Sequence, residues 1–300
     1  MEDGKVVLGL AIFLMISIVT FLLYAPLLVS ISFDVERDPP VANENQITFR
    51  GIDEIPAILR ILNKHDVRST FFVTGRVVER YPEALVRIKE DGHEIGVHGG
   101  YYHDRVFVSL TKEEQRDMIS QTADYIKDSV GISPLGFRAP GHRIDSNTLS
   151  TLEELNFLYD SSVVPSAAGW YLYAHPPSSP ERPYRPDAHN PFLVGSMRLT
   201  EVPLTPVFLN GNLDTLLGYQ GKIITEIELL IAIFECKLEG TPLVLYLHPG
   251  LMVDLPNKPS DIKAGKYLQG EFDDILYFLD RFNVRYVRMK DLVTKQQQNS

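Results

Sequence analysis

The chain has 300 residues, of which 44% are hydrophobic and 10% aromatic, so it can form a large core and is too apolar for general disorder. Its 39 acidic residues outnumber its 29 basic residues, and the formal net charge of -10 argues against a nucleic-acid binder. The single cysteine, Cys236, excludes an intramolecular disulfide and a cysteine-based zinc cluster. Because Cys236 lies in an apolar run, we expect it to be buried.

The first apolar segment has the length of a membrane-spanning helix. No charged residue occurs from Val6 to Phe33. The densest part, Val6–Tyr24, would extend about 28 Å as a helix, close to the thickness of the hydrocarbon core of a bilayer. A cleaved signal peptide usually has a shorter apolar region and a small-residue cleavage site, which this segment lacks. We therefore predict an uncleaved anchor over residues 1–27, with a cleaved signal or a buried helix as the alternatives.

The basic residues around this segment indicate its orientation. Lys5 and the terminal amine precede it, and the nearest basic residue after it is Arg37. Since basic residues favour the cytoplasmic end of a membrane span, we expect a cytoplasmic N-terminus and a single-pass membrane protein. The globular part, residues 28–294, would then be extracytoplasmic, and residues 295–300 would form a polar tail.

Strand and helix patterns alternate along the rest of the chain. In chain order we expect a strand at 27–33, a helix at 52–62, a strand at 69–73, a helix at 81–91, a strand at 94–97, a helix at 111–130, a strand at 136–138, a helix at 148–155, strands at 157–159 and 199–202, a helix at 224–238, a strand at 243–247, a helix at 272–279 and a strand at 284–287. This alternation predicts a parallel α/β architecture, and some seven or eight units favour a barrel over an open sheet.

One region interrupts the alternation. Residues 165–206 contain nine of the 20 prolines, and they also contain the only tryptophan, Trp170. A long irregular segment in a compact domain is usually a functional loop or a linker. Because the pattern resumes after it, we interpret it as a loop within one domain. Trp170 and the neighbouring tyrosines could form a sugar-stacking platform or the small core of the loop itself.

Polar side chains recur just past the expected strands, where the active groups of a parallel barrel lie. They are Asp34, Glu36, His98, His103, Arg138, His142, Asp160 and His248. Two histidines and a carboxylate can hold a zinc-type ion and leave one position open for water. A further carboxylate could take a proton from that water, and a further histidine could protonate a leaving group.

The motifs around these residues resemble those of the polysaccharide deacetylase family, also called the NodB-homology or carbohydrate esterase 4 family. The resemblance covers residues 28–292 and includes the connecting sequence STFFVTG. The five motifs, in the family's order, are SFDVE at 32–36, HEIGVHGGYYHD at 93–104, FRAPGHR at 137–143, LYDSS at 158–162 and LYLHPG at 245–250. Each motif alone is a weak signal, but five in this order are specific.

The resemblance implies a distorted (β/α) barrel of about seven units that hydrolyses an acetamide, or another carbon–nitrogen amide, with a divalent metal. By position it implies that Asp34 is the general base and that Arg138 orients it. It also implies that His248 is the general acid and that Asp160, in the fourth motif, supports His248.

The resemblance also implies a metal site, for which zinc is the expected ion, with His98 and His103 as ligands. Two departures from the family pattern concern this site. The usual second aspartate of the first motif is replaced by Val35, which has no donor atom, and Glu36 follows. Because strand side chains alternate, residues 34 and 36 point the same way, so Glu36 is the predicted carboxylate ligand. The alternative is that Glu36 is a charge at the rim of the site, paired with Arg37 or Arg138. The two histidines are five residues apart instead of four, with a glycine pair between them.

Two functions are compatible with these residues. The first is a membrane-anchored, metal-dependent hydrolase that removes acetyl groups from an N-acetylated glycan or cell-surface polysaccharide. An O-acetyl ester or a small cyclic amide is an alternative substrate. The second is a non-catalytic glycan-binding or scaffold protein that retains the barrel. Glu36 favours the enzyme, because a protein without activity has no need of a replacement carboxylate.

Other histidines have structural interpretations. We expect His65 at a solvated helix end and His93 in a turn that it stabilises. We expect His142 to be structural, solvated or in contact with substrate. His175 and His189 lie in the proline-rich loop, where we expect them to be exposed.

Overall fold

The computed structural model describes residues 2–38, 47–101, 107–166, 175–207, 212–254 and 263–298. The side chains of residues 2–4, 6, 9 and 295–298 are not described. Two residues named above, His103 and Trp170, lie outside the described ranges.

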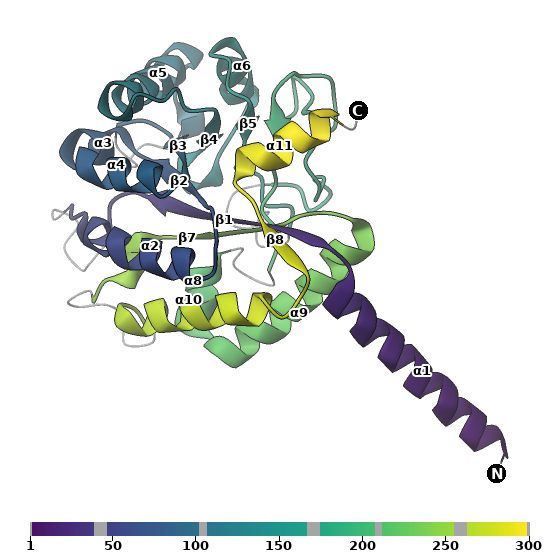
Figure 1. The fold of residues 1–300 in the computed structure, drawn as a ribbon. Coiled ribbons are helices and arrows are strands. Elements are labelled where there is room, and N and C mark those ends of the chain that lie inside the picture. Colours follow the sequence, from purple (N-terminus) through teal and green to yellow (C-terminus); the bar gives the residue numbers. More distant parts are fainter. Residues whose placement is uncertain are drawn as a thin grey trace.

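The centre of the molecule is one parallel sheet (Figure 1). Its strands are β1 (Leu27–Val35), β2 (Thr70–Val73), β3 (Glu94–His98), β4 (Gly136–Arg138), β5 (Tyr159–Asp160), β6 (Thr200–Glu201), β7 (Leu243–Leu247) and β8 (Val284–Tyr286). Seven of them follow the order β6-β5-β4-β3-β2-β1-β7, and β8 pairs with the beginning of β1. Beyond β6, the Thr205 N–H donates to the Val244 carbonyl of β7 (3.0 Å), which links the two ends of the path. The predicted parallel α/β fold is confirmed as a half-barrel of seven strands, consistent with a (β/α) barrel.

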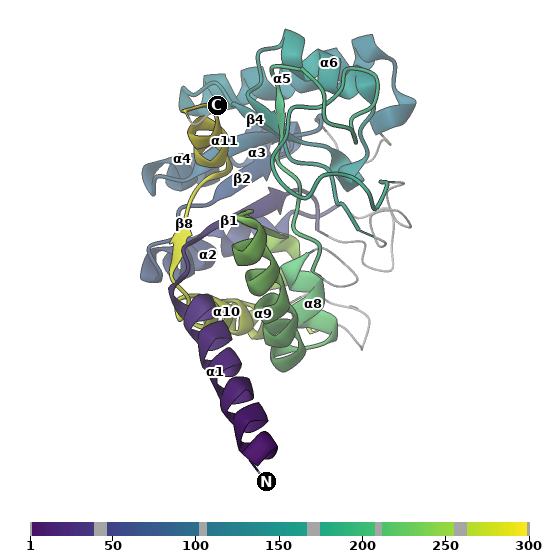
Figure 2. The same ribbon diagram turned by 90° about the vertical axis from the view of Figure 1, so that its right-hand side faces the viewer.

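Helices cover the outside of this sheet, as Figures 1 and 2 show. They are α2 (Ile55–Lys64), α3 (Gly75–Arg80), α4 (Pro82–Glu90), α5 (Lys112–Val130), α6 (Ser146–Glu154), α8 (Leu213–Tyr219), α9 (Lys222–Glu239) and α10 (Lys266–Leu279). The last helix, α11 (Met289–Gln298), packs instead against the interior. Helices α3 and α8 were not predicted, because six or seven residues are too few to display a helical period. Helix α11 was not predicted either, and it extends into the segment expected to be a polar tail.

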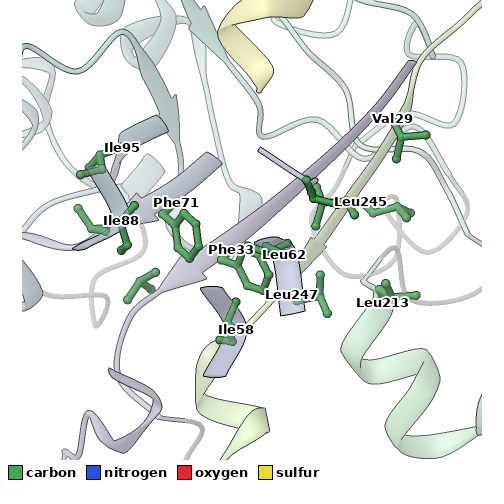
Figure 3. Close-up of a cluster of buried hydrophobic side chains, with 14 of the residues drawn as sticks. Val29, Phe33, Ile58, Leu62, Phe71, Ile88, Ile95, Leu213, Leu245 and Leu247 are labelled. Atoms are coloured by element: carbon green, nitrogen blue, oxygen red, sulfur yellow. The ribbon is translucent and has the colours of Figure 1, made fainter. Parts of the chain in front are cut away.

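The strands separate an apolar outer layer from a more polar interior. Outward-facing residues such as Phe33, Phe71 and Leu245 pack against the helices, as Figure 3 shows, and full burial of such a side chain stabilises the fold by about 1.5–3 kcal/mol. The next residues along the strands, including Asp34 and Phe72, face the other way because strand side chains alternate. The same alternation therefore builds the core and delivers polar groups to the interior.

The C-terminal segment lies against the interior of the half-barrel. Val287, at the end of β8, donates its N–H to the Val29 carbonyl (2.9 Å). The N–H of Met289 donates to Thr70 Oγ1 (3.0 Å), and the N–H of Lys290 donates to the Glu94 carboxylate (3.1 Å). The first turn of α11 is thereby fixed across β1, β2 and β3.

Helix α1 (Glu2–Tyr24) projects away from the rest of the molecule (Figures 1 and 2). It exposes large apolar side chains, with Phe13 70% and Leu10 64% exposed. Its last turn contacts α9, where the rings of Phe21 and Phe234 lie 6.2 Å apart. Within the described part of the chain, no helix is both long enough and apolar enough to cross a membrane. The predicted transmembrane helix is therefore not confirmed.

Candidate active site

The carboxyl ends of neighbouring strands bring the predicted catalytic residues together. Asp34 lies within β1, one residue before its end, because β1 is two residues longer than predicted. His98 ends β3 and is directly paired with Arg138, which ends β4. His248 follows β7, which pairs with β1 on the side opposite β2. Parallel pairing therefore places residues that are far apart in the sequence at one edge of the sheet.

Arg138 is the fully buried centre of a hydrogen-bond network. One terminal nitrogen, Nη1, donates to Asp34 Oδ1 (2.8 Å) and to Ser32 Oγ (2.9 Å). On its other side, the Arg138 guanidinium donates from Nε to the Ser161 carbonyl (2.8 Å) and from Nη2 to Ser161 Oγ (3.0 Å). The guanidinium also lies 4.4 Å from the centre of the Phe72 ring. With these contacts Arg138 has one orientation, and it fixes the Asp34 carboxylate.

The charges around Asp34 keep its carboxyl group ionised. Burial alone would raise the pKa of Asp34, but the positive charges of Arg138 and His98 outweigh burial and hold this pKa below its usual value. An ionised carboxylate with one oxygen bound to Arg138 still has lone pairs that can accept a proton. The geometry therefore suits Asp34 to the role of general base.

His98 and Glu36 form a pair that fits a metal ion. The Nδ1–H of His98 donates to the Arg138 carbonyl (3.0 Å), which directs Nε2 towards Glu36 Oε2 at 3.2 Å. Because a carboxylate oxygen can only accept, this contact needs either a proton on Nε2 or a cation between the two atoms. Burial would lower the pKa of His98, but the Asp34 and Glu36 carboxylates raise it, so a positive charge is favoured there. A histidine oriented by a carbonyl and facing a carboxylate is a common arrangement in metal sites.

The third predicted ligand, His103, lies outside the described residues. Within the described ranges, no group of three or more His, Cys, Asp or Glu side chains could hold a metal ion. The turn that leads towards His103 begins at Gly99, which follows His98. Gly99 has φ +63°, and a Cβ atom there would lie 2.2 Å from Pro140 Cγ, so only glycine fits. Gly99 is thus packed against Pro140 of the third motif.

His248 is held by a carboxylate that the sequence did not reveal. Its Nδ1 donates to Asp214 Oδ2 (3.0 Å), and the same oxygen accepts the backbone N–H of His248. Asp214 lies in the first turn of α8, where Asn212 is the N-cap. Burial would lower the pKa of His248, but the Asp214 carboxylate raises it to about 10. His248 is therefore protonated at neutral pH and can donate a proton.

Asp160 does not support His248, contrary to the prediction. Its Oδ1 accepts a hydrogen bond from Ser162 Oγ (2.7 Å), and the carboxyl group contacts Glu201. The reason is the alternation of β5: Tyr159 faces the interior beside Phe72, so the next residue faces the opposite side. The acid histidine is instead supported by Asp214.

The remaining histidines are mostly structural. His65 is not solvated, because Asp280 (2.6 Å) and Asp273 (3.0 Å) contact its two ring nitrogens. His175 is also buried, contrary to the prediction. His93 accepts the Ser69 N–H (3.0 Å), which agrees with its predicted role in a turn.

His142 lies at the site in a strained conformation. It is buried with φ +60°, in the left-handed region that non-glycine residues seldom adopt. Its ring centre lies 4.9 Å from that of Tyr246, which lies on the interior face of β7. Strain of this kind is found at functional sites more often than elsewhere.

Comparisons with known proteins agree with this geometry. Residues 43–159 match the family described as polysaccharide deacetylase. A peptidoglycan deacetylase of Helicobacter pylori is 31% identical over 116 residues, which are 39% of this chain and 39% of the relative. The chain thus spans about two fifths of the length of that relative.

Similar solved structures cover nearly the whole chain. The Puue allantoinase superposes with a TM-score of 0.65 at 18% identity and covers 90% of each chain. Peptidoglycan deacetylase PdaC of Bacillus subtilis superposes with a TM-score of 0.51 at 20% identity, over 91% of this chain and 93% of that one. At these identities the two structures show a shared fold.

Proposed function

Because the chain contains a domain of the polysaccharide deacetylase family, as its motifs predicted, we propose that it removes acetyl groups from an N-acetylated carbohydrate polymer. The observation that carries this proposal is the pairing of an ionised base, Asp34, with a protonated acid, His248, at the ends of adjacent strands. The similarity to a peptidoglycan deacetylase supports a cell-wall glycan as the substrate class.

The reaction breaks an amide C–N bond and forms a C–O bond to acetate. Asp34 accepts the proton that the attacking water loses, while Arg138 holds the carboxylate in place. The imidazolium of His248 then donates a proton to the departing nitrogen, which leaves as the free amine of the sugar. Asp214 stabilises the charged form of His248 before this step and fixes its tautomer afterwards.

A divalent ion, for which we propose zinc, would be held by Glu36 and His98, with His103 as the further ligand that the family motif provides. When bound, such an ion polarises the acetyl carbonyl and acidifies the attacking water. The position of His98 Nε2 at 3.2 Å from Glu36 Oε2, where a cation can replace the ring proton, supports this assignment.

Metal content tests the role of Glu36. We expect Glu36→Gln and His98→Ala to bind less metal than the wild type, because each loses a donor on one side of the pair. The measurement is elemental analysis of the purified proteins, with Glu113→Gln, on the exposed start of α5, as the matched control. Full occupancy in Glu36→Gln with loss only in His98→Ala would contradict the ligand role of Glu36.

We also propose that α1 attaches the protein to a membrane, with the catalytic domain on the extracytoplasmic side. The uncharged sequence from Val6 to Phe33 supports this, as do the exposed apolar side chains of the helix. Each Å² of this surface removed from water would stabilise the bound state by about 25 cal/mol.

N-terminal sequencing of protein extracted from membranes tests this attachment. We expect the mature chain to begin before Val6, since α1 must be retained to act as an anchor. A mature chain that begins after Tyr24 would show that the segment is a cleaved signal.

The substrate class is tested with two kinds of amide. The full-length protein in detergent is incubated with N-acetylated oligosaccharides and, separately, with a small cyclic amide, before and after chelation. We expect chelator-sensitive acetate release from the sugar. Ring opening of the cyclic amide alone would contradict the proposed substrate, and binding of the glycan without turnover would favour the non-catalytic scaffold.

A further inference from the structure

Two fully buried carboxyl groups lie next to each other behind the catalytic arginine. Asp160 of β5 and Glu201 of β6 are directly paired in the sheet register, and neither side chain is exposed. Ser162 donates to both carboxyl groups, from its backbone N–H to Glu201 Oε1 and from Oγ to Asp160 Oδ1, so the two groups lie side by side. Two negative charges buried this close repel each other strongly, so the pair is expected to hold a proton.

The other contacts of the pair locate this proton. Asp160 Oδ1 accepts from Ser162 Oγ (2.7 Å). Glu201 Oε1 accepts the N–H groups of Ser162 (3.2 Å) and Val163 (2.9 Å). The second oxygens, Asp160 Oδ2 and Glu201 Oε2, are buried and have no hydrogen-bond partner in the described part of the chain. They are therefore the two oxygens left to bind a shared proton.

The electrostatics agree with a shared proton. Burial and the adjacent Asp160 carboxyl raise the pKa of Glu201 well above its usual value, and burial raises that of Asp160 to about 6. Like charges this close cannot both be ionised in a buried site. At neutral pH the pair thus carries one proton and one negative charge.

The pair is connected to Arg138 through the turn that follows β5. Ser162 Oγ, which donates to Asp160, accepts the N–H of Ala139, the residue after Arg138 (2.9 Å). Ser161, between Asp160 and Ser162, accepts two hydrogen bonds from the Arg138 guanidinium, through its carbonyl and its hydroxyl. The acid pair therefore fixes the segment that holds one side of Arg138, while Asp34 lies on the other side.

We infer that Asp160 and Glu201 form a proton-sharing acid pair that positions Arg138, and through it Asp34, for the reaction. This role rests on the proposed function. It assigns Asp160 to positioning the base and identifies Glu201, which none of the five motifs contains, as a second positioning residue.

Two substitutions of Glu201 distinguish the loss of its hydrogen bonds from the loss of its charge. In Glu201→Gln, the amide oxygen can still accept from Ser162 and Val163, and the amide N–H can replace the shared proton. In Glu201→Leu, both interactions are lost. We expect kcat of Glu201→Gln to stay within about threefold of the wild type, and kcat of Glu201→Leu to fall about 100-fold with little change in KM.

Thermal unfolding of each variant checks that it is folded. If Glu201→Leu does not fold, Asp160→Asn serves as a second substitution, because its amide can replace the shared proton from the other side. We expect it to behave like Glu201→Gln. Equal losses in folded Glu201→Gln and Glu201→Leu, or full activity in folded Glu201→Leu, would overturn the positioning role, as would a large loss in Asp160→Asn.

Infrared difference spectroscopy tests the proton itself without relying on activity. We expect a carboxylic-acid C=O band in the wild type that disappears in Glu201→Gln. If the spectra show no such loss, the pair does not share a proton. This measurement tests whether Asp160 and Glu201 share a proton even if the protein releases no acetate. Its outcome is therefore separate from that of the proposed function.

Discussion

An Asp34→Asn variant is expected to lose about 10²- to 10⁴-fold in kcat, the range by which a general base accelerates proton transfer. The asparagine keeps the shape of the side chain and can still accept a hydrogen bond from Arg138, but it cannot take a proton from water. The substitution also leaves the fully buried Arg138 without its carboxylate partner, which would destabilise the fold by about 3–5 kcal/mol.

The measurement is a steady-state assay below the unfolding temperature, together with thermal unfolding and metal content of the same preparation. Asp66→Asn is the matched control, because the Asp66 side chain is 97% exposed and makes only a distant contact with Arg68. If folded Asp34→Asn with normal metal content retained near wild-type activity, Asp34 would not be the base.

The second large effect is expected for Asp214→Asn, through the acid His248. Since the Asp214 carboxylate raises the pKa of His248, its removal lets burial lower that pKa, and the imidazolium is lost at a lower pH. The alkaline limb of the rate profile should therefore move to lower pH. Above that limb we expect a loss of about 10²- to 10⁴-fold, the range for a general acid.

The pH dependence of stability should change in the same variant. In the wild type, the raised pKa of His248 contributes stability that is fully present below about pH 6.5, the usual pKa of histidine, and is lost as pH rises towards 10. Asp214→Asn should remove this contribution. An unchanged alkaline limb would mean that Asp214 does not control the acid. Asp187→Asn is the control, because among the described residues Asp187 Oδ1 accepts only backbone N–H groups, those of His189 and Asn190, which an asparagine oxygen can also accept.

The sequence predicted the strands and the residues at their ends because both depend on local pattern. Short apolar runs such as 243–247 are visible as strands, and the polar residues that follow them are visible as candidates. Parallel pairing then brings Asp34, His98, Arg138 and His248 to one edge of the sheet without further information. The start of the helix expected at 111–130 was also readable, because Thr111 forms a capping box with Glu114 whose two hydrogen bonds lie within four residues.

What the sequence did not reveal depends on contacts between distant segments. Asp214 follows the Asn212 N-cap, but nothing in its neighbourhood indicates that α8 places it against β7. Glu201 lies on the strand expected at 199–202, within the proline-rich region, but a strand of two residues is too short for alternation to show which way its side chains face. The role of Asp160 was misread for a related reason: whether a side chain faces the interior depends on the strand's exact register with its neighbours.

The central claim is that Asp34 and His248 hydrolyse the amide of an acetylated sugar. The most direct measurement quantifies acetate and free amine released from an N-acetylated oligosaccharide by the metal-loaded full-length protein, in water enriched in ¹⁸O. We predict equal amounts of the two products and one solvent oxygen in each acetate, with neither product formed at a comparable rate by Asp34→Asn. Acetate and amine released equally fast by Asp34→Asn, or no acetate from the wild type, would contradict the claim.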